Sequence, residues 1–166
     1  NAGVAGNTSR DLLSRFQAEV VDLHPDWVSI LIGMNDVWRQ FDTPAMPDYQ
    51  VQPEEYRANV EQMLQALQGK VKGIFLMTPY YLEPNQEDWM RSRMNEYGQI
   101  CRELAGKYGC ILVDLQEAFD RYFRYRHSAF IAWDRIHPNL VGATVIAKEF
   151  LAKCAFDYQH IPGKQD

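Results

Sequence analysis

The fold is indicated first by Trp27-Val-Ser-Ile-Leu-Ile-Gly33, a short apolar run bounded by turn residues. Such a run is typical of a β-strand that is buried on both of its faces. Similar runs occupy residues 73–78 and 110–114. Because helical patterns separate the three runs, we expect an α/β fold with a parallel sheet that helices cover on both faces.

The helices are marked by their ends and by their apolar stripes. Asn7 or Thr8 can cap the first helix. A loop rich in Pro and Asp is expected after the first strand, and the next helix begins at Pro53. The remaining helices are expected over the residues before Gly109, over residues 115–122 and over residues 140–151.

The composition fits one folded domain with an acidic surface. The chain has 166 residues, of which 46% are hydrophobic, so a single core can form. We expect residues 1–153 to form the domain and residues 154–166 to form a polar tail. A formal net charge of −5 argues against nucleic acid as a partner.

Cysteine usage and hydropathy restrict the setting in which the chain works. Cys101, Cys110 and Cys154 form no CxxC pair, and scattered cysteines indicate free thiols in a reducing compartment, so we expect a cytoplasmic protein. No apolar run is long enough to cross a bilayer, and no membrane span is expected. The His, Cys and carboxylate residues show no metal-ligand spacing, so neither a metal nor another cofactor is expected.

Residues that can take part in chemistry gather where strands are expected to end. Gly6 opens the first helix, Asn35 follows the first strand, and Asp134 stands three residues before His137. In a parallel sheet the carboxyl ends of the strands form the active crevice. There the Gly6 N–H and the Asn35 amide suit a developing oxyanion, while Asp134 can orient His137 as an acid and base. Taken singly, the same residues also fit a turn glycine, an Asx-turn and a helix cap.

Taken together, three motifs resemble the SGNH hydrolases, also called the GDSL esterase/lipase family. Its second, third and fifth blocks are similar to Asn1-Ala-Gly-Val-Ala-Gly-Asn-Thr8, Gly33-Met-Asn-Asp36 and Asp134-Arg-Ile-His-Pro138. The resemblance implies a flavodoxin-like, three-layer α/β/α sandwich. It also implies that Gly6 and Asn35 donate to the oxyanion and that Asp134 and His137 belong to a catalytic triad. By the same resemblance, Asp36 is structural.

The family's first block, Gly-Asp-Ser, is absent from these 166 residues. That block supplies the nucleophilic serine and a further oxyanion donor, and no serine in the chain follows a strand in a sharp turn. We therefore expect a segment before Asn1 that carries the serine together with two strands and a helix. Without it, the strand at Trp27 leaves an open sheet edge, which that segment or self-association with another chain would cover.

The implied activity is the hydrolysis of a small-molecule ester by a serine enzyme. The serine would attack the ester carbonyl, His137 would move the proton, and water would release the acyl group. Candidate substrates are acetylated carbohydrates and short lipid esters. Trp38, Tyr80 and Trp133 would form an aromatic wall around the crevice, although ordinary packing under long loops explains the same aromatics.

Two other functions remain open at this point. A chain without a nucleophile would be a non-catalytic α/β binding or scaffold domain that keeps the pocket. A phosphoesterase on a similar sheet is disfavoured, because the chain shows neither the metal ligands nor the phosphate-binding loop of such an enzyme.

Overall fold

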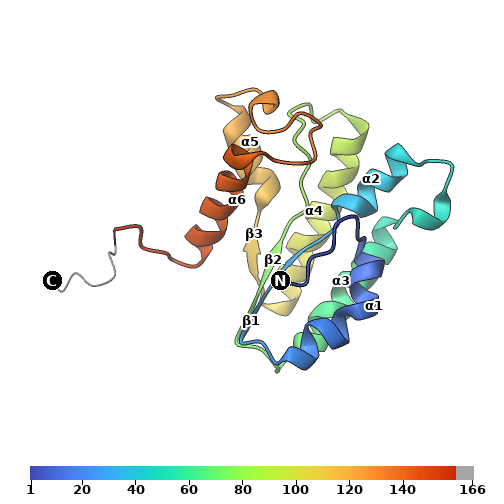
Figure 1. Ribbon diagram of the computed structural model, residues 1–166, viewed down its shortest axis with the longest axis vertical. Coiled ribbons are helices and arrows are strands. Elements are labelled where there is room, and N and C mark those ends of the chain that lie inside the picture. Colours follow the sequence, from blue (N-terminus) through green and yellow to red (C-terminus); the bar gives the residue numbers. More distant parts are fainter. Residues whose placement is uncertain (160–166) are drawn as a thin grey trace.

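The computed structural model describes residues 1–159 and has a parallel sheet at its centre (Figure 1). Its strands are β1 (Trp27–Leu31), β2 (Gly73–Met77) and β3 (Ile111–Val113), in the spatial order β1-β2-β3. Val28 pairs with Ile74, and Phe75 pairs with Ile111, in parallel register. The predicted parallel sheet is therefore confirmed.

Helices flank this sheet on both faces. They are α1 (Ser9–Glu19), α2 (Met34–Asp42), α3 (Pro53–Leu67), α4 (Trp89–Tyr108), α5 (Leu115–Phe123) and α6 (Leu140–Lys153). In Figure 1, α1, α3 and α4 lie on one side of the sheet, and α5 and α6 lie on the other. Each side has an apolar core of its own, one around Val60 and Met94 and the other around Leu115 and Phe119. This is the expected three-layer α/β/α arrangement.

Most helix ends follow the predicted signals. Thr8 caps α1 in a reciprocal capping box, since its side chain accepts from the Asp11 N–H and the Asp11 carboxylate accepts from the Thr8 N–H at 2.8 Å. Pro53 begins α3, and Gly109 ends α4 in the left-handed conformation with φ of 65°. Residues 154–159 follow α6 as the start of the expected tail, and residues 160–166 lie outside the described part of the chain.

The prediction of a loop after the first strand is wrong for the first half of that segment, because residues 34–42 form α2. Gly33 sits at the N-cap with φ of 122°, and a Cβ there would lie 3.0 Å from the Tyr56 ring and 3.1 Å from Pro79. The helix buries Asp36 and Val37 completely. Tertiary burial thus stabilises a short helix whose own residues, followed by Pro and Asp, show no long apolar stripe.

The expectation that the first strand is buried on both faces is also wrong. Val28 and Ile30 are buried, but the alternate residues Trp27 and Leu31 are 51% and 42% exposed. Within residues 1–159, β1 pairs with β2 alone and forms an edge of the sheet. The Trp27 ring meets Phe75 at a centroid distance of 5.5 Å, and the rest of that face of β1 is left open.

Two absences can be stated for residues 1–159. No helix there has both the length and the apolar character that crossing a bilayer requires. In the same residues, no group of three or more His, Cys, Asp and Glu side chains is arranged to hold a metal ion.

Candidate active site

The turn that contains Asp134 and His137 brings the two side chains into direct contact. One carboxylate oxygen of Asp134 lies 2.6 Å from His137 Nδ1, and the other accepts from the backbone N–H groups of Ile136 at 3.0 Å and His137 at 2.8 Å. Between them, Arg135 adopts the left-handed conformation with φ of 64°, which turns the chain tightly enough for these contacts. Assigning the Nδ1 proton to this contact leaves His137 Nε2 for another partner.

The hydrogen bonds on Asp134 keep this carboxylate charged. Burial alone would raise its pKa, but the His137 ring and the backbone N–H groups of His137 and Ile136 together outweigh burial and lower the pKa to about 2. The Asp134 side chain is 17% exposed, whereas the His137 side chain is 64% exposed. The pair therefore offers an imidazole that is oriented by an anion and open to a reacting group.

Contacts from the loop after β2 hold the dyad turn in place. The Leu82 N–H donates to the Arg135 carbonyl at 2.9 Å, and the Arg135 guanidinium pairs with Glu83 at 2.5 Å. The same guanidinium lies over the Tyr81 ring at 5.7 Å. The backbone and side chain of Arg135 thus both connect the turn to residues 81–83.

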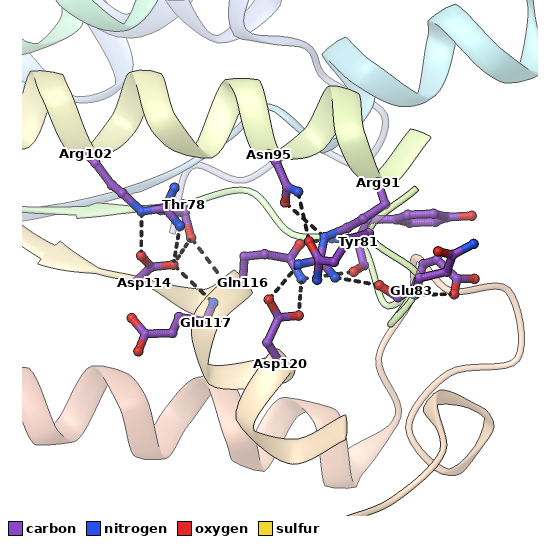
Figure 2. A network of polar contacts seen from close by, with 12 residues as sticks. Thr78, Tyr81, Glu83, Arg91, Asn95, Arg102, Asp114, Gln116, Glu117 and Asp120 are labelled. Atoms are coloured by element: carbon purple, nitrogen blue, oxygen red, sulfur yellow. Dashed lines mark hydrogen bonds and ion pairs between the residues drawn. The ribbon is translucent and has the colours of Figure 1, made fainter. Parts of the chain in front are cut away.

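A buried polar network fixes that loop in turn (Figure 2). Arg91 on α4, 1% exposed, donates to the Glu83 carbonyl and pairs with Asp120 on α5, both at 2.5 Å. The Gln116 side chain accepts from the Tyr81 N–H at 2.8 Å and donates to the Tyr81 carbonyl at 3.2 Å. Because these buried groups are hydrogen-bonded, the loop has a defined position relative to α4 and α5.

The two expected oxyanion donors line one cavity of about 210 Å³. Gly6 has φ of 82°, and its N–H has no acceptor among residues 1–159. The Asn35 side-chain amide donates to the Asn7 carbonyl at 2.9 Å, which ties α2 to the turn before α1 and leaves one amide hydrogen for a ligand. Tyr80 lines the same cavity.

A buried network supports this side of the site. Asp36, with no exposed surface, accepts from the Ser9 N–H at 3.1 Å and 2.9 Å and from the Ser9 hydroxyl, and Asn59 on α3 donates to that hydroxyl at 3.0 Å. Desolvation by burial raises the pKa of Asp36 to about 6, although the Ser9 hydrogen bonds oppose the shift. The network joins α1, α2 and α3 beneath Gly6 and Asn35.

The three expected aromatic residues occupy different surroundings. The Trp38 ring meets the His137 ring edge to face at a centroid distance of 5.8 Å, and Trp38 lies one turn after Asn35 on α2. Tyr80 is 8% exposed and packs on Phe119 at 4.8 Å while lining the Gly6 cavity. Trp133 is 89% exposed and lines a separate hollow with Glu83. Trp38 therefore connects the dyad to the oxyanion side, and Trp133 does not.

Comparison with known proteins places this arrangement in a family. The model of the GDSL-like lipase/acylhydrolase family matches residues 1–145. The chain belongs to this family. As a member, it is a carboxylic ester hydrolase with an α/β fold.

Individual relatives share most of the chain. It is 42% identical over 158 residues to an acetylxylan esterase from Geobacillus stearothermophilus. The matched residues cover 95% of this chain and 72% of that esterase. A solved structure of that organism's acetylxylan esterase Axe2 has a TM-score of 0.94 at 41% identity, covering 96% of this chain and 73% of Axe2. The α/β hydrolase LAE5 from the metagenome of Lake Arreo, Spain, has a TM-score of 0.91 at 53% identity, over 93% of this chain and 71% of LAE5.

Further structures of Axe2 are of variants described as catalytic mutants. In separate variants a serine, an aspartate or a histidine is replaced by alanine. The mutated aspartate and histidine stand three positions apart in Axe2. Asp134 and His137 have the same separation in this chain.

Sequence reasoning missed the residues that support the site. Ser9 donates to Asp36 from 27 positions away, Asn59 donates to Ser9 from 50 positions away, and Arg91 reaches Asp120 over 29 positions. The one local signal is Arg91 itself, a charged residue directly after Met90 on the apolar stripe of α4. Such a residue is seldom buried without a partner, so its position could have predicted a paired arginine, a prediction that the sequence analysis did not make.

Proposed function

We propose that the protein is a serine esterase that removes acetyl groups from xylan-type saccharides. The observation that carries the proposal is the 2.6 Å contact between Asp134 and His137 Nδ1, with Nε2 open to a reacting group. Such a pair needs a nucleophile, and we assign that role to a serine in a segment that precedes Asn1. The catalytic mutants of Axe2, at a serine and at an aspartate and histidine with the spacing of Asp134 and His137, support the assignment.

The reaction follows from the geometry in two halves. In the first, His137 Nε2 takes the serine proton as the serine oxygen attacks the ester carbonyl, and Asp134 stabilises the imidazolium. The Gly6 N–H and the free Asn35 amide hydrogen donate to the oxyanion. Collapse expels the alcohol, which His137 protonates, and an acetyl-enzyme remains. In the second half water attacks the acetyl-enzyme by the same steps, and acetate leaves.

The choice of an acetyl group rests on size and on the relatives. The cavity at Gly6 and Asn35 has about 210 Å³, which is below the roughly 300–1,000 Å³ of clefts that hold drug-sized ligands. A short acyl group suits such a space better than a fatty acyl chain. The relatives named above include an acetylxylan esterase and an acetyl-xylooligosaccharide esterase.

The position proposed for the serine segment is the open edge of β1. A groove of about 310 Å³ runs along this edge, between β1 and α1, and Asn1 lies at it. Its apolar lining includes Phe16, Val28 and Leu31. An added parallel strand would pair with β1 and would end beside Gly6 and Asn35, where a nucleophile is needed. Self-association of two copies at this edge is the competing way to cover it.

We also place the protein in a reducing compartment and expect no metal or other cofactor in the reaction. Cys101 is buried, Cys110 is partly buried and Cys154 is exposed, and all three are free thiols. Free thiols of this kind are typical of the cytoplasm. The proposed chemistry uses the side chains of a triad and two hydrogen-bond donors, with no further group.

Acetate release by the full-length protein tests the proposal. Acetylated xylo-oligosaccharide and p-nitrophenyl acetate should both be hydrolysed, and His137→Ala should lower kcat by roughly 10⁶-fold. The matched control is His24→Asn, an exposed left-handed position at the opposite end of β1, which should keep the wild-type rate. Turnover retained in His137→Ala would overturn the dyad assignment. Hydrolysis of the aryl ester alone would overturn the proposal that the substrate is a saccharide ester. If neither ester is hydrolysed, the result would favour the alternative of a non-catalytic binding domain.

A further inference from the structure

A second and larger cavity lies on the other side of Gly6. It has about 490 Å³ and is lined by the start of α1, the second half of α2 and the loop after α2. Gly6 lines both this cavity, here called the Tyr49 cavity, and the smaller one that contains Asn35. Its volume falls within the roughly 300–1,000 Å³ that is typical of small-molecule sites. A ligand that reaches from one cavity to the other would therefore pass over Gly6.

The wall that carries Tyr49 is fixed to the rest of the protein. Arg10 on α1 makes a two-pronged contact with Glu55 on α3, at 2.6 Å and 2.8 Å. The same guanidinium donates to the carbonyls of Asp48 at 2.7 Å and Gln50 at 3.1 Å. Because a bidentate guanidinium holds a defined geometry, the loop around Tyr49 is preorganised and does not need a ligand to shape it.

The charges in the lining are mostly neutralised from within. Arg10 is paired with Glu55, and Arg39 is paired with Asp42 at 2.5 Å while lying over the Trp38 ring at 5.0 Å. The Asp11 carboxylate accepts from the Thr8 N–H and hydroxyl at 2.8 Å and 2.7 Å. The Asp48 carboxylate also lines the cavity, and it has no ion pair within residues 1–159. Because both guanidinium groups of the lining are already paired, the cavity has little to offer an anionic ligand, and its N–H and oxygen groups can bind hydroxyls.

The rim adds a flat apolar surface. Tyr49 is 60% exposed and Met46 is 51% exposed, and both line the cavity. Aromatic rings beside polar groups suit amphipathic ligands, which present C–H groups on one face and hydroxyls at their edges. Neutral saccharides have this character, whereas a fatty acyl chain would meet Arg10, Arg39 and Asp48 without compensation.

We propose that the Tyr49 cavity is the subsite for the saccharide that carries the ester. The inference rests on the proposed function and adds a direction to it. The acetyl group lies on the Asn35 side of Gly6, and the neutral sugar units extend over Gly6 toward Tyr49. Tyr49 then determines specificity for the alcohol part of the ester and takes no part in the chemical steps.

The test compares two acetyl esters that share the chemistry and differ in the alcohol. With the full-length protein, kcat/KM is measured for acetylated xylo-oligosaccharide and for p-nitrophenyl acetate, and their ratio is the readout. Tyr49→Ala should lower the saccharide-to-aryl ratio about tenfold, because binding energy of the remote sugar units is used in the transition state. The matched control is Tyr125→Ala, which removes another exposed tyrosine outside this cavity and should leave the ratio unchanged.

A second variant, which fills the Tyr49 cavity, controls for a local change of structure in Tyr49→Ala. Thr43→Trp narrows the cavity from α2's C-terminal cap and should lower the same ratio by about tenfold or more if sugars occupy the space. An unchanged ratio in both Tyr49→Ala and Thr43→Trp would overturn the subsite, and equal losses on both esters would also overturn it. If the wild-type protein hydrolyses neither ester, the result would instead count against the proposed function, so the two failures are distinguishable.

Discussion

Two aspartates support the two halves of this site, and their pKa values are shifted in opposite directions. Asp36 lies beside the proposed oxyanion donors with no exposed surface, and its pKa is raised to about 6. Asp134 lies in the dyad turn, and hydrogen bonds lower its pKa to about 2. Both carboxylates accept several hydrogen bonds, so the number of bonds does not decide the outcome. For the fully buried Asp36, desolvation outweighs the hydrogen bonds and raises the pKa. For the partly exposed Asp134, the imidazole and two backbone N–H groups outweigh desolvation and lower the pKa.

The difference separates a carboxylate that we propose to be structural from one that we propose to be functional. Asp36 joins three helices through Ser9 and Asn59, and it has no contact with His137. Asp134 is coupled to an imidazole that is open to solvent. We therefore expect substitutions at Asp36 to act first on stability and substitutions at Asp134 to act first on rate.

Among the substitutions that test this contrast, the largest expected effect is on the rate of Asp134→Asn. Loss of the anion removes the group that orients and stabilises the His137 imidazolium, so kcat should fall by roughly 10³- to 10⁴-fold. The midpoint of thermal unfolding should fall only modestly, because the Asn carbonyl oxygen can still accept from the backbone N–H groups of Ile136 and His137. Initial-rate kinetics and calorimetry on the same preparations measure both. A variant that unfolds early but keeps its kcat would reverse the comparison.

Asp36→Ala should show the opposite pattern. It leaves the Ser9 N–H and hydroxyl in the interior without their acceptor, which should cost about 3 kcal/mol in the free energy of unfolding. Urea denaturation followed by circular dichroism gives this value. A loss below about 1 kcal/mol would mean that the buried network contributes little to stability.

The pH dependence of stability sharpens the same contrast. The pKa of Asp36 is about 6 in the folded protein against an ordinary value of 3.8, so its contribution is full below pH 3.8 and is lost as the pH rises through 6. The pKa of Asp134 is lowered, so its contribution is full above pH 3.8 and is lost as the pH falls toward 2. The stability advantage of wild type over Asp36→Asn should shrink between pH 4 and 6. A constant difference across that range in urea titrations would count against a raised pKa of Asp36.

The smallest expected effect concerns Arg135. Arg135→Ala removes the exposed ion pair with Glu83 and keeps the left-handed backbone, so unfolding should become easier by about 1 kcal/mol and kcat should fall a few-fold. Arg135→Gly removes the same ion pair but favours the left-handed conformation, so its stability should lie closer to wild type. The pair of variants separates backbone strain from the ion pair. Equal stabilities in the two variants would show that the backbone conformation at this position costs nothing.

Sequence patterns predicted the parts of the molecule that depend on neighbours in the chain. The strands, the cap at Thr8 and the Asp134-to-His137 spacing are local signals, and the structure contains each of them. The one-sided burial of β1 and the existence of α2 depend on which elements cover them. Their residues alone therefore led to the wrong predictions of a strand buried on both faces and of a loop after it.

The supporting networks and the Tyr49 cavity could not be predicted from local sequence patterns, because they also depend on contacts between distant segments. Arg10 meets Glu55 across 45 positions, and Arg91 meets Asp120 across 29. Such pairs form only when helices that are distant in the sequence pack together. They determine where the loops of the site lie, and the motifs determine what those loops carry.

The most direct test of the central claim is a crystal structure of the full-length protein after reaction with a serine-directed phosphonate. We predict one covalent adduct, on a serine that precedes Asn1, with its Oγ beside His137 Nε2. The phosphonate oxygen should lie about 2.7–3.2 Å from both the Gly6 nitrogen and Asn35 Nδ2. An adduct at another position, or an oxygen that faces away from Gly6 and Asn35, would contradict the assignment of these residues to one active site.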